Sequence, residues 1–379
     1  MATRGTGNQA RPPANDRQPG ITDVRGVDSS RLLAPGAERR QSLAGFDPDY
    51  VDIVDYIVRC THKIWEEKNA GLIYTHYLHN SIIHSGDGAT YGREAVTQGT
   101  IQSIAAYPDE LCFADDVVWT GNDVDGFYTS HRNTTIARNT GATFYGPPAN
   151  RQVRRTGIAL CYVRENRIIE EWVVRDDLAV IQCLGLDLEE TVARLARRDP
   201  GSPQEHEAHG EIERTLGQLA PEPYRARAGA AFDIDEFARR TLNEVWNRRM
   251  LGELQRAYAA NYVCHTMGDR NLYGRGQYAA WVLALLGALP DAQLIVDQLF
   301  WIDDGDGRYR TSLRWSLLGT HSGGGMFGPP TGVRCRLWGI THHHIRDGQF
   351  AEEWTYTNEL AVRKRIWLAR NGESEQAHH

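Results

Sequence analysis

Hydrophobic residues in the second half of the chain follow a helical period first and an alternating one afterwards. Across residues 235–259, Phe237, Leu242 and Val245 recur at the spacing of one helix face. Leu251, Leu254 and Tyr258 continue this spacing, and a third helix is predicted over 276–290, which ends at Pro290. Four strand-like runs follow, at 292–303, 309–321, 333–345 and 349–357. Asp/Gly turns separate several of these runs, which predicts an antiparallel meander.

This order of elements predicts the fold class. Helices followed by a meander are typical of an α+β domain, in which a curved antiparallel sheet wraps around the helices. We therefore expect a pocket between the helices and the curved sheet.

The chain contains this unit twice. The sequence EEWVVRDDLAV at 170–180 recurs as EEWTYTNELAV at 352–362, an offset of 182 residues. The same offset maps Arg132 onto Arg314, Trp119 onto Trp301, Pro108 onto Pro290, and residues 145–148 onto 327–330. A register kept through so many unlike residues indicates two copies of one domain.

The repeat sets the domain boundaries. We expect one domain at 46–187 and a second at 232–371, each of ordinary single-domain size. A charged segment with Pro and Gly at 188–231 is predicted to be a linker with one short helix. Residues 1–45 are predicted to form a flexible N-terminal arm, and 372–379 a C-terminal tail.

Composition narrows the classes of function. The 379 residues carry 42 Lys and Arg against 49 Asp and Glu, and this net charge of −7 argues against a nucleic-acid or membrane partner. The six cysteines form no C-x-x-C pair, so free thiols in a reducing cytoplasm are expected. Neither a membrane helix nor a secretory signal is recognisable. We expect a cytoplasmic protein that acts on a small molecule.

Several segments resemble one known family. In the second copy these are VWNRRMLGELQRAYAANYVCH at 245–265, RWSLLGTHSGGGMFGPPTG at 314–332 and GITHHHIRDGQFAEEW at 339–354. In the first copy, IIEEWVVRDDLAVIQCLG at 168–185 matches best. Together they are similar to the SnoaL-like polyketide cyclase family of the nuclear transport factor 2-like superfamily. The resemblance implies a cone-shaped fold that serves cyclases, isomerases, hydratases and non-catalytic binders.

The resemblance also implies a catalytic residue. In the family's cyclases, an aspartate four residues after the closing tryptophan is the general acid/base. Trp172 plus four is Asp176, whereas Trp354 plus four is Asn358. A carboxyl group in an apolar pocket can exchange protons near neutral pH, and an amide cannot. The first copy is therefore expected to carry the chemistry, without a metal or an organic cofactor.

Three consecutive histidines form a second candidate site. Because side chains alternate along a strand, His342 and His344 share one face and His343 takes the other. The aligned residues of the first copy are Leu160 and Tyr162, which suggest an inward face, so we expect both imidazoles in the second pocket.

The role of these histidines stays open at this stage. A polar pocket, an acid/base pair and packing histidines are all compatible with the pattern. With His265 or His321 the pair could also ligate a metal. The first copy lacks the cluster, so no metal is expected.

Further polar residues complete the two predicted pockets. His84 and His265 occupy matching places, and each either holds a loop or lies at a pocket mouth. Arg132 and Arg314 also repeat, and they either bind a substrate oxygen or form ion pairs on the outer face. His131 with Tyr162 and Trp172 is assigned to the first pocket, although His131 could instead lie on the sheet surface. His265, Arg314, His321, His342, His344 and Asn358 are assigned to the second.

The sequence thus predicts an enzyme of the SnoaL-like type, with Asp176, His84 and His131 as its catalytic groups. Cofactor-independent acid/base chemistry on an oxygenated metabolite is expected, as cyclisation, isomerisation or hydration/dehydration. The alternative is a non-catalytic ligand-binding or assembly module, because Asn358 already departs from the catalytic pattern. The expected partner is a small-molecule substrate, with a homodimer or an intramolecular pairing of the two domains.

Overall fold

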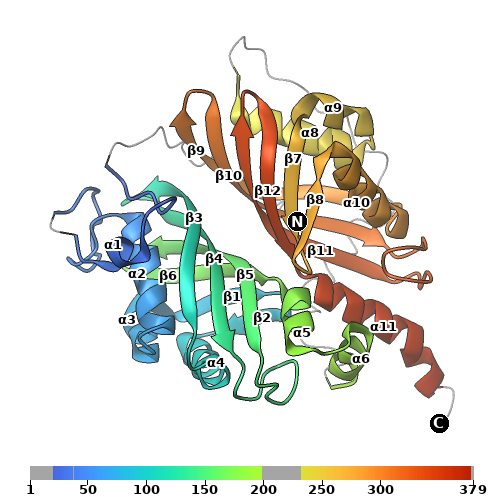
Figure 1. The fold of residues 1–379 in the computed structure, drawn as a ribbon, viewed down its shortest axis with the longest axis horizontal. Helices are drawn as coiled ribbons and strands as arrows, with labels where there is room; N and C mark the ends of the chain where they lie inside the picture. The colour runs from blue at the N-terminus through green and yellow to red at the C-terminus, as the bar shows by residue number, and fades with distance from the viewer. Residues whose placement is uncertain (1–19, 37, 199–231, 377–379) are drawn as a thin grey trace, which may run out of the picture.

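Two six-stranded sheets of identical topology make up the computed structural model, which describes residues 20–36, 38–198 and 232–376 (Figure 1). The strand orders are β2-β1-β6-β5-β4-β3 and β8-β7-β12-β11-β10-β9. Each sheet carries its own helices on one face (Figure 1). The predicted α+β class and the tandem of like domains are confirmed.

In the first domain, the Asp52 carboxylate caps the N-terminus of the long helix α2 by accepting a hydrogen bond from the Asp55 amide. Its helices are α1 (Ser29–Leu33), α2 (Ile53–Trp65), α3 (Ile73–His76), α4 (Arg93–Ala106), α5 (Asp177–Leu184) and α6 (Leu188–Arg198). Its strands are β1 (Tyr77–Ser85), β2 (Gly88–Tyr91), β3 (Leu111–Asn122), β4 (Gly126–Arg138), β5 (Gln152–Arg164) and β6 (Arg167–Arg175).

The second domain repeats this order, and Asp233 caps its first helix through the Glu236 amide. Its helices are α8 (Ile234–Leu242), α9 (Leu254–Ala257), α10 (Gly274–Ala288) and α11 (Glu359–Gln376). Its strands are β7 (Tyr258–Thr266), β8 (Arg270–Tyr273), β9 (Gln293–Gly305), β10 (Arg308–Thr320), β11 (Arg334–Arg346) and β12 (Gln349–Thr357).

Each sheet is mixed, where the sequence suggested a wholly antiparallel one. The four long strands form the predicted meander, but β1 pairs with β6 and β7 with β12 in parallel. A parallel pair needs a crossover, and the helix with the strands between β1 and β6 supplies it. The meander was recognised because its turns are short; the parallel neighbour has no such local signal.

The two sheets pack against each other through the faces that point away from their helices (Figure 1). Strand β3 contacts β9 and β10, and β6 contacts β12. One apolar cluster includes Val117 and Ile158 of the first domain together with Phe300, Ile340 and Tyr356 of the second. The domains are therefore paired within one chain, and both faces of each sheet are buried.

Two segments outside the predicted domains are ordered in part. Residues 20–36 and 38–45, expected to belong to a flexible arm, lie on the first domain with Val24 and Leu43 buried in its core. The Pro/Gly-rich composition led to the prediction of a flexible arm, because it outweighed these two apolar residues. Within the predicted linker, 188–198 forms α6, which packs on α11. The rest of the linker and residues 1–19 lie outside the described residues.

Candidate active site

A cavity of about 320 Å³ lies between the helices and the sheet of the first domain. Helices α2 and α4 cover it, and one face of β4, β5 and β6 forms its floor. Alternate residues of β6, Glu171, Val173 and Arg175, point into it, as the period of a strand requires. Ala95 and Gly99 line the cavity and are exposed, so it opens to solvent along α4.

The strand register places polar groups on both sides of a small-residue floor. Gly157 and Ala159 on the central strand β5 form the middle of the floor. Gly157 is paired with Arg175 on β6, and Ala159 is paired with His131 on β4. A ligand resting on the two small residues would thus meet an imidazole on one side and a guanidinium on the other.

His131 is the buried base of this cavity. Its side chain is 2% exposed, and its Nε2 atom has no hydrogen-bond partner among the described residues. Burial lowers the pKa of the imidazole to about 4, because the charged form loses its hydration. The ring is therefore neutral near pH 7 and can accept a proton or a hydrogen bond from a bound molecule.

Glu171 supplies a carboxyl group to the same cavity. Its Oε2 atom accepts a hydrogen bond of 3.0 Å from the Tyr77 hydroxyl. Burial raises the pKa of Glu171 and outweighs the lowering effect of this hydrogen bond. The cavity thus holds a base with a lowered pKa and an acid with a raised one, a combination suited to proton transfer.

Two guanidinium groups line the cavity, and they differ in whether a carboxylate is bound to them. Arg155 donates to both carboxylate oxygens of Glu110, at 3.1 and 3.0 Å, and is neutralised by it. Arg175 makes no hydrogen bond or ion pair with any described residue. Burial, followed by the nearby charge of Arg155, lowers the pKa of Arg175. The charges of Glu171 and Asp177 oppose this lowering of the Arg175 pKa, but neither carboxylate forms a hydrogen bond or ion pair with the guanidinium group.

The equivalent space in the second domain is filled by its helix. At the repeat offset of 182, Val96 and Gly99 of α4 correspond to Tyr278 and Trp281 of α10. Both aromatic side chains belong to the hydrophobic core of the second domain. A side chain added at Gly99 would meet nothing within 4 Å.

Three polar positions of the floor are apolar in the second domain. His131, Asn133 and Arg155 correspond to Leu313, Trp315 and Leu337, all of which are buried in the core. Thr357 stands in the place of Arg175, and Glu353, the equivalent of Glu171, is bonded by the Tyr262 hydroxyl. The imidazole, the amide and the two guanidinium groups of the first cavity therefore have no counterpart at these positions of the second domain, although Glu353 and His343 still place polar groups on that side of its sheet.

Comparison with known proteins identifies the fold family. Residues 236–366 match the family model of the SnoaL-like polyketide cyclases. The second domain is a SnoaL-like domain. The first domain has the same strand order, so the chain is a tandem of this fold, as the sequence predicted.

Among solved structures, the chain is similar to a protein from Jannaschia sp. CCS1 assigned as a SnoaL-like polyketide cyclase. The identity is 20% over 37% of this chain and 98% of that one, with a TM-score of 0.32. A polyketide cyclase-like protein from Acidithiobacillus ferrooxidans is 24% identical over 35% and 94% of the two chains, with a TM-score of 0.31. TsrD from Streptomyces laurentii is 18% identical over 36% and 98%, with a TM-score of 0.30. No curated protein sequence matches this chain.

Asp176, the residue that the family resemblance selected, lies between the two SnoaL-like domains. Its carboxylate accepts from the amide of Ala179, which caps α5, and from the amides of Gly268 and Asp269 in the other domain, at 3.0, 2.6 and 2.8 Å. Burial raises the pKa of this carboxyl group. Asp176 does not line the described cavity. Its equivalent, Asn358, accepts from the Trp338 amide at 2.9 Å.

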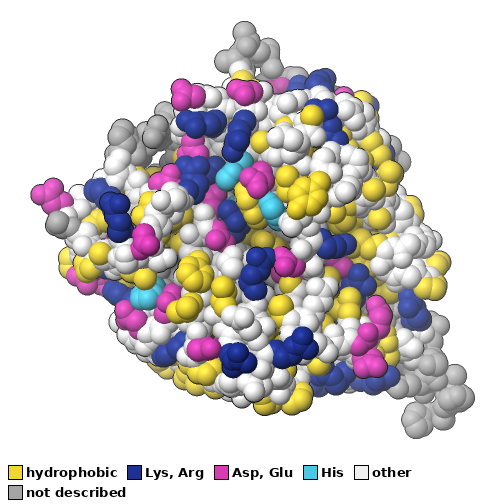
Figure 2. Space-filling model, viewed as in Figure 1, with side chains coloured by type: hydrophobic (Ala, Val, Ile, Leu, Met, Phe, Trp, Pro, Cys, Tyr) yellow, Lys and Arg dark blue, Asp and Glu magenta, His cyan; other side chains and the backbone are white. Residues whose placement is uncertain are grey.

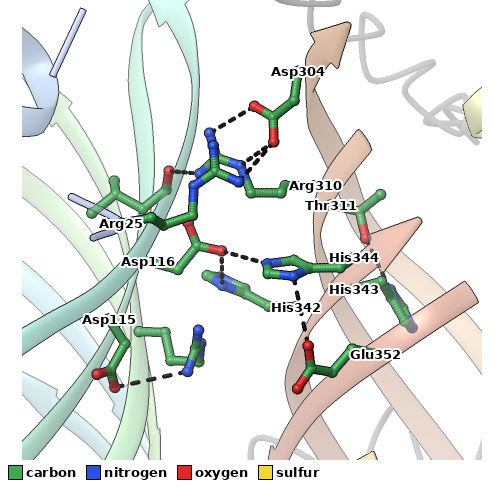
Figure 3. Close-up of polar contacts among 12 residues, drawn as sticks. Arg25, Asp115, Asp116, Asp304, Arg310, Thr311, His342, His343, His344 and Glu352 are labelled. Atoms are coloured by element: carbon green, nitrogen blue, oxygen red, sulfur yellow. Dashed lines mark hydrogen bonds and ion pairs between the residues drawn. The ribbon is translucent and has the colours of Figure 1, made fainter. Parts of the chain in front are cut away.

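The triple-histidine strand is oriented opposite to the prediction. His342 and His344 face the first domain and the Asp116 carboxylate, and His344 Nε2 lies 3.3 Å from an Asp116 oxygen (Figure 3). His342 Nε2 lies 2.8 Å from the Ser130 hydroxyl. His343 points to the helix side of its own sheet and bonds Thr311 at 2.9 Å. Leu160 and Tyr162 were a misleading guide, because apolar residues lie on both faces of a sheet that is covered on both sides.

Asp116 joins these histidines to the interface. Its carboxylate also accepts from Arg310 Nη1 at 2.5 Å, and Arg310 in turn binds Asp304 (Figure 3). Burial lowers the pKa of His342 to about 3, so that imidazole is neutral. Along the line where the domains meet, Figure 2 shows histidine, basic and acidic side chains gathered together.

The repeated arginines bind aromatic rings across the interface. The Arg132 guanidinium lies over the ring of Trp354 at 3.9 Å, and Arg314 lies over Trp172 at 4.3 Å. This reciprocal pattern is that of a two-fold related pair of domains. Neither arginine lines the cavity of the first domain.

The remaining predicted residues lie outside this cavity too. His84 bonds Glu170 at 2.8 Å, and His265 bonds Glu352 at 3.0 Å. His321 is buried and bonds Thr331. The Tyr162 hydroxyl donates to the Asp125 carbonyl, and its ring stacks on Tyr128. Of the twelve site residues that the sequence suggested, His131 is the one that lines the described cavity.

Within 20–36, 38–198 and 232–376, no group of three or more His, Cys, Asp or Glu side chains is placed to hold a metal ion. No helix in these ranges is long and apolar enough to cross a bilayer.

Sequence reasoning missed Tyr77, Arg155, Glu171 and Arg175, which all line the cavity. Each is a common residue type without a motif. The usable signal was the contrast between the two copies, since Gly99 against Trp281 at one offset indicates a space that one copy keeps and the other fills.

Proposed function

We propose that the first domain catalyses cofactor-independent proton transfer on a small oxygenated molecule, with His131 as the base and Glu171 as the acid. The observation that carries this proposal is the unpartnered Nε2 atom of His131 in an open cavity whose counterpart is filled in the second domain. Cyclisation, isomerisation and dehydration all begin with removal of a proton next to a carbonyl group.

In the proposed step, His131 takes a proton from the carbon next to a substrate carbonyl group. The electrons of the C–H bond move to the carbonyl oxygen as an enolate. Glu171, whose pKa is raised by burial, donates its proton to that oxygen or holds it in a hydrogen bond. Return of the proton to a different carbon gives an isomer, and attack of the enolate on a second carbonyl group gives a ring.

Exchange of hydrogen for deuterium tests this step without knowledge of the natural substrate. The α-hydrogens of 2-tetralone, a two-ring ketone, are followed by NMR in D₂O with and without the protein. We expect the protein to accelerate exchange, and His131→Gln to lower the protein-dependent rate by about a hundredfold or more, the usual scale for a general base.

A second variant tests whether the exchange reaction takes place in this cavity. Gly99→Trp introduces into α4 the residue that α10 carries at the same position, and should block the cavity. Gly287→Trp, at an exposed glycine of α10 with free space around it, is the matched control. Exchange that survives Gly99→Trp would place the chemistry elsewhere, and binding of 2-tetralone without exchange would favour a non-catalytic binding module.

A further inference from the structure

We propose that Arg175 binds a carboxylate on the substrate, so that the first domain takes an oxygenated ring compound bearing one carboxylic acid group. This inference rests on the proposed function, because it concerns the same cavity. It adds the chemical class of the substrate and the orientation in which it binds.

The state of Arg175 is the first observation. A guanidinium group placed in a protein interior normally has a carboxylate or several acceptors around it. Arg155 in the same cavity has such a partner in Glu110, at 3.0 and 3.1 Å. Arg175 has no hydrogen bond or ion pair with any described residue, although it lines the cavity and lies beside the positive Arg155. A planar carboxylate matches the two-donor edge of a guanidinium and would supply the missing counter-charge.

The second copy supports this interpretation. Thr357 and Leu337 occupy the places of Arg175 and Arg155, and the space above them is filled. If Arg175 only stabilised the fold of the sheet, the same sheet in the second domain would be expected to need it. The arginine is present instead in the domain whose cavity has space for a ligand.

The register gives the orientation of the ligand. Arg175 on β6 and His131 on β4 are separated by strand β5. Their partners on β5, Gly157 and Ala159, are two residues apart along that strand. The backbones of Arg175 and His131 are therefore roughly 12 Å apart, from two strand spacings of about 4.8 Å and two residues of about 3.4 Å. A two-ring molecule held at Arg175 by its carboxylate would lie over the small residues and present its far edge to His131.

The charge of the ligand is limited to one. Glu110 and Glu171 both line the region next to Arg175. A second negative charge on the ligand would find no free cation, because Arg155, the other guanidinium group of the cavity, is already paired with Glu110. A monoanionic carboxylate is therefore favoured over a phosphate dianion.

Calorimetric titration with 2-naphthoate and its neutral isostere 2-naphthamide tests the inference. Wild-type protein should bind 2-naphthoate about tenfold or more tighter than 2-naphthamide, the scale of a hydrogen bond to a charged group. Arg175→Met should remove this preference and leave 2-naphthamide binding unchanged. The control Arg164→Met, at a half-exposed arginine of β5, should keep it.

Three outcomes would overturn the inference. One is wild-type protein without a preference for the carboxylate, or without binding of either probe. Another is equal loss of both probes in Arg175→Met, the result of a structural role. The third is tighter binding of 2-naphthyl phosphate than of 2-naphthoate. His131→Gln separates the two proposals, since it should abolish deuterium exchange and retain the preference for 2-naphthoate.

Discussion

Replacing His131 by leucine should stabilise the protein, and more so in acid. Leucine is the residue that the second domain has at this position, Leu313, so the sheet accommodates it. Near pH 7 the imidazole is neutral but keeps a buried nitrogen without a partner, which costs about 1 kcal/mol or more. His131→Leu removes that cost, and we expect an increase of about 1 kcal/mol in the free energy of unfolding.

The pH dependence follows from the lowered pKa. In the unfolded chain the imidazole takes up a proton near pH 6.5, whereas in the folded protein it does so near pH 4. Between these values the unfolded state binds more protons, so wild-type stability falls as the pH is lowered from 7 to 4 and the fall levels off below 4. At about 1.4 kcal/mol per pKa unit, the loss is about 3 kcal/mol.

Urea unfolding at several pH values between 4 and 8 measures this difference. The advantage of His131→Leu over wild type should grow from about 1 kcal/mol at pH 7 to about 4 kcal/mol at pH 4. His342, also buried and neutral, is present in both proteins and cancels. His79→Leu, at an exposed histidine of β1, is the control and should follow the wild-type profile. An advantage of His131→Leu that does not change with pH would refute the claim that burial holds this imidazole neutral.

Three further predictions concern other parts of the molecule. Asp176→Asn should lower the free energy of unfolding by about 1–3 kcal/mol, because the amide group cannot accept all three backbone hydrogen bonds; a hundredfold loss of deuterium exchange in this variant would instead support Asp176 as the acid/base. Arg310→Met should destabilise the protein by about 3–5 kcal/mol by leaving Asp116 buried without its main counter-ion, whereas Arg308→Met, at an exposed arginine two residues away, should change stability by less than about 0.5 kcal/mol. Dialysis against a strong chelator should leave deuterium exchange unchanged, and loss of exchange together with a stoichiometric metal would contradict the proposed mechanism.

The fold was predictable because its signals are local and repeated. Helical spacing near Phe237, strand runs between Asp/Gly turns and the 182-residue offset each identify an element or a pairing without knowledge of the rest. The parallel β1–β6 pair was not predictable in this way, because it joins segments some 90 residues apart that no turn connects.

The site was harder to predict, because it depends on which face of the sheet each polar side chain occupies. The orientation of His342 and His344 was inferred from apolar partners, on the assumption that one sheet face is buried and the other wet. Pairing of the two domains also buries the face that points away from the helices, and there His342 and His344 contact Ser130 and Asp116 of the first domain. Period-2 reasoning grouped His342 with His344 correctly and could not tell which way the pair points.

The two copies of the fold divide two requirements between them: one holds a cavity with polar groups, and the other has a filled and stable core. A cavity that contains an unpartnered imidazole and a desolvated guanidinium lowers the stability of the domain that holds it. The second copy has the same sheet with Tyr278, Trp281 and Trp315 in that space, and its core is continuous. Because its outer face buries the outer face of the first sheet, the filled copy stabilises the copy that carries the cavity. The duplication therefore lets one half of the chain keep groups that a single small domain could hold only at a larger loss of stability.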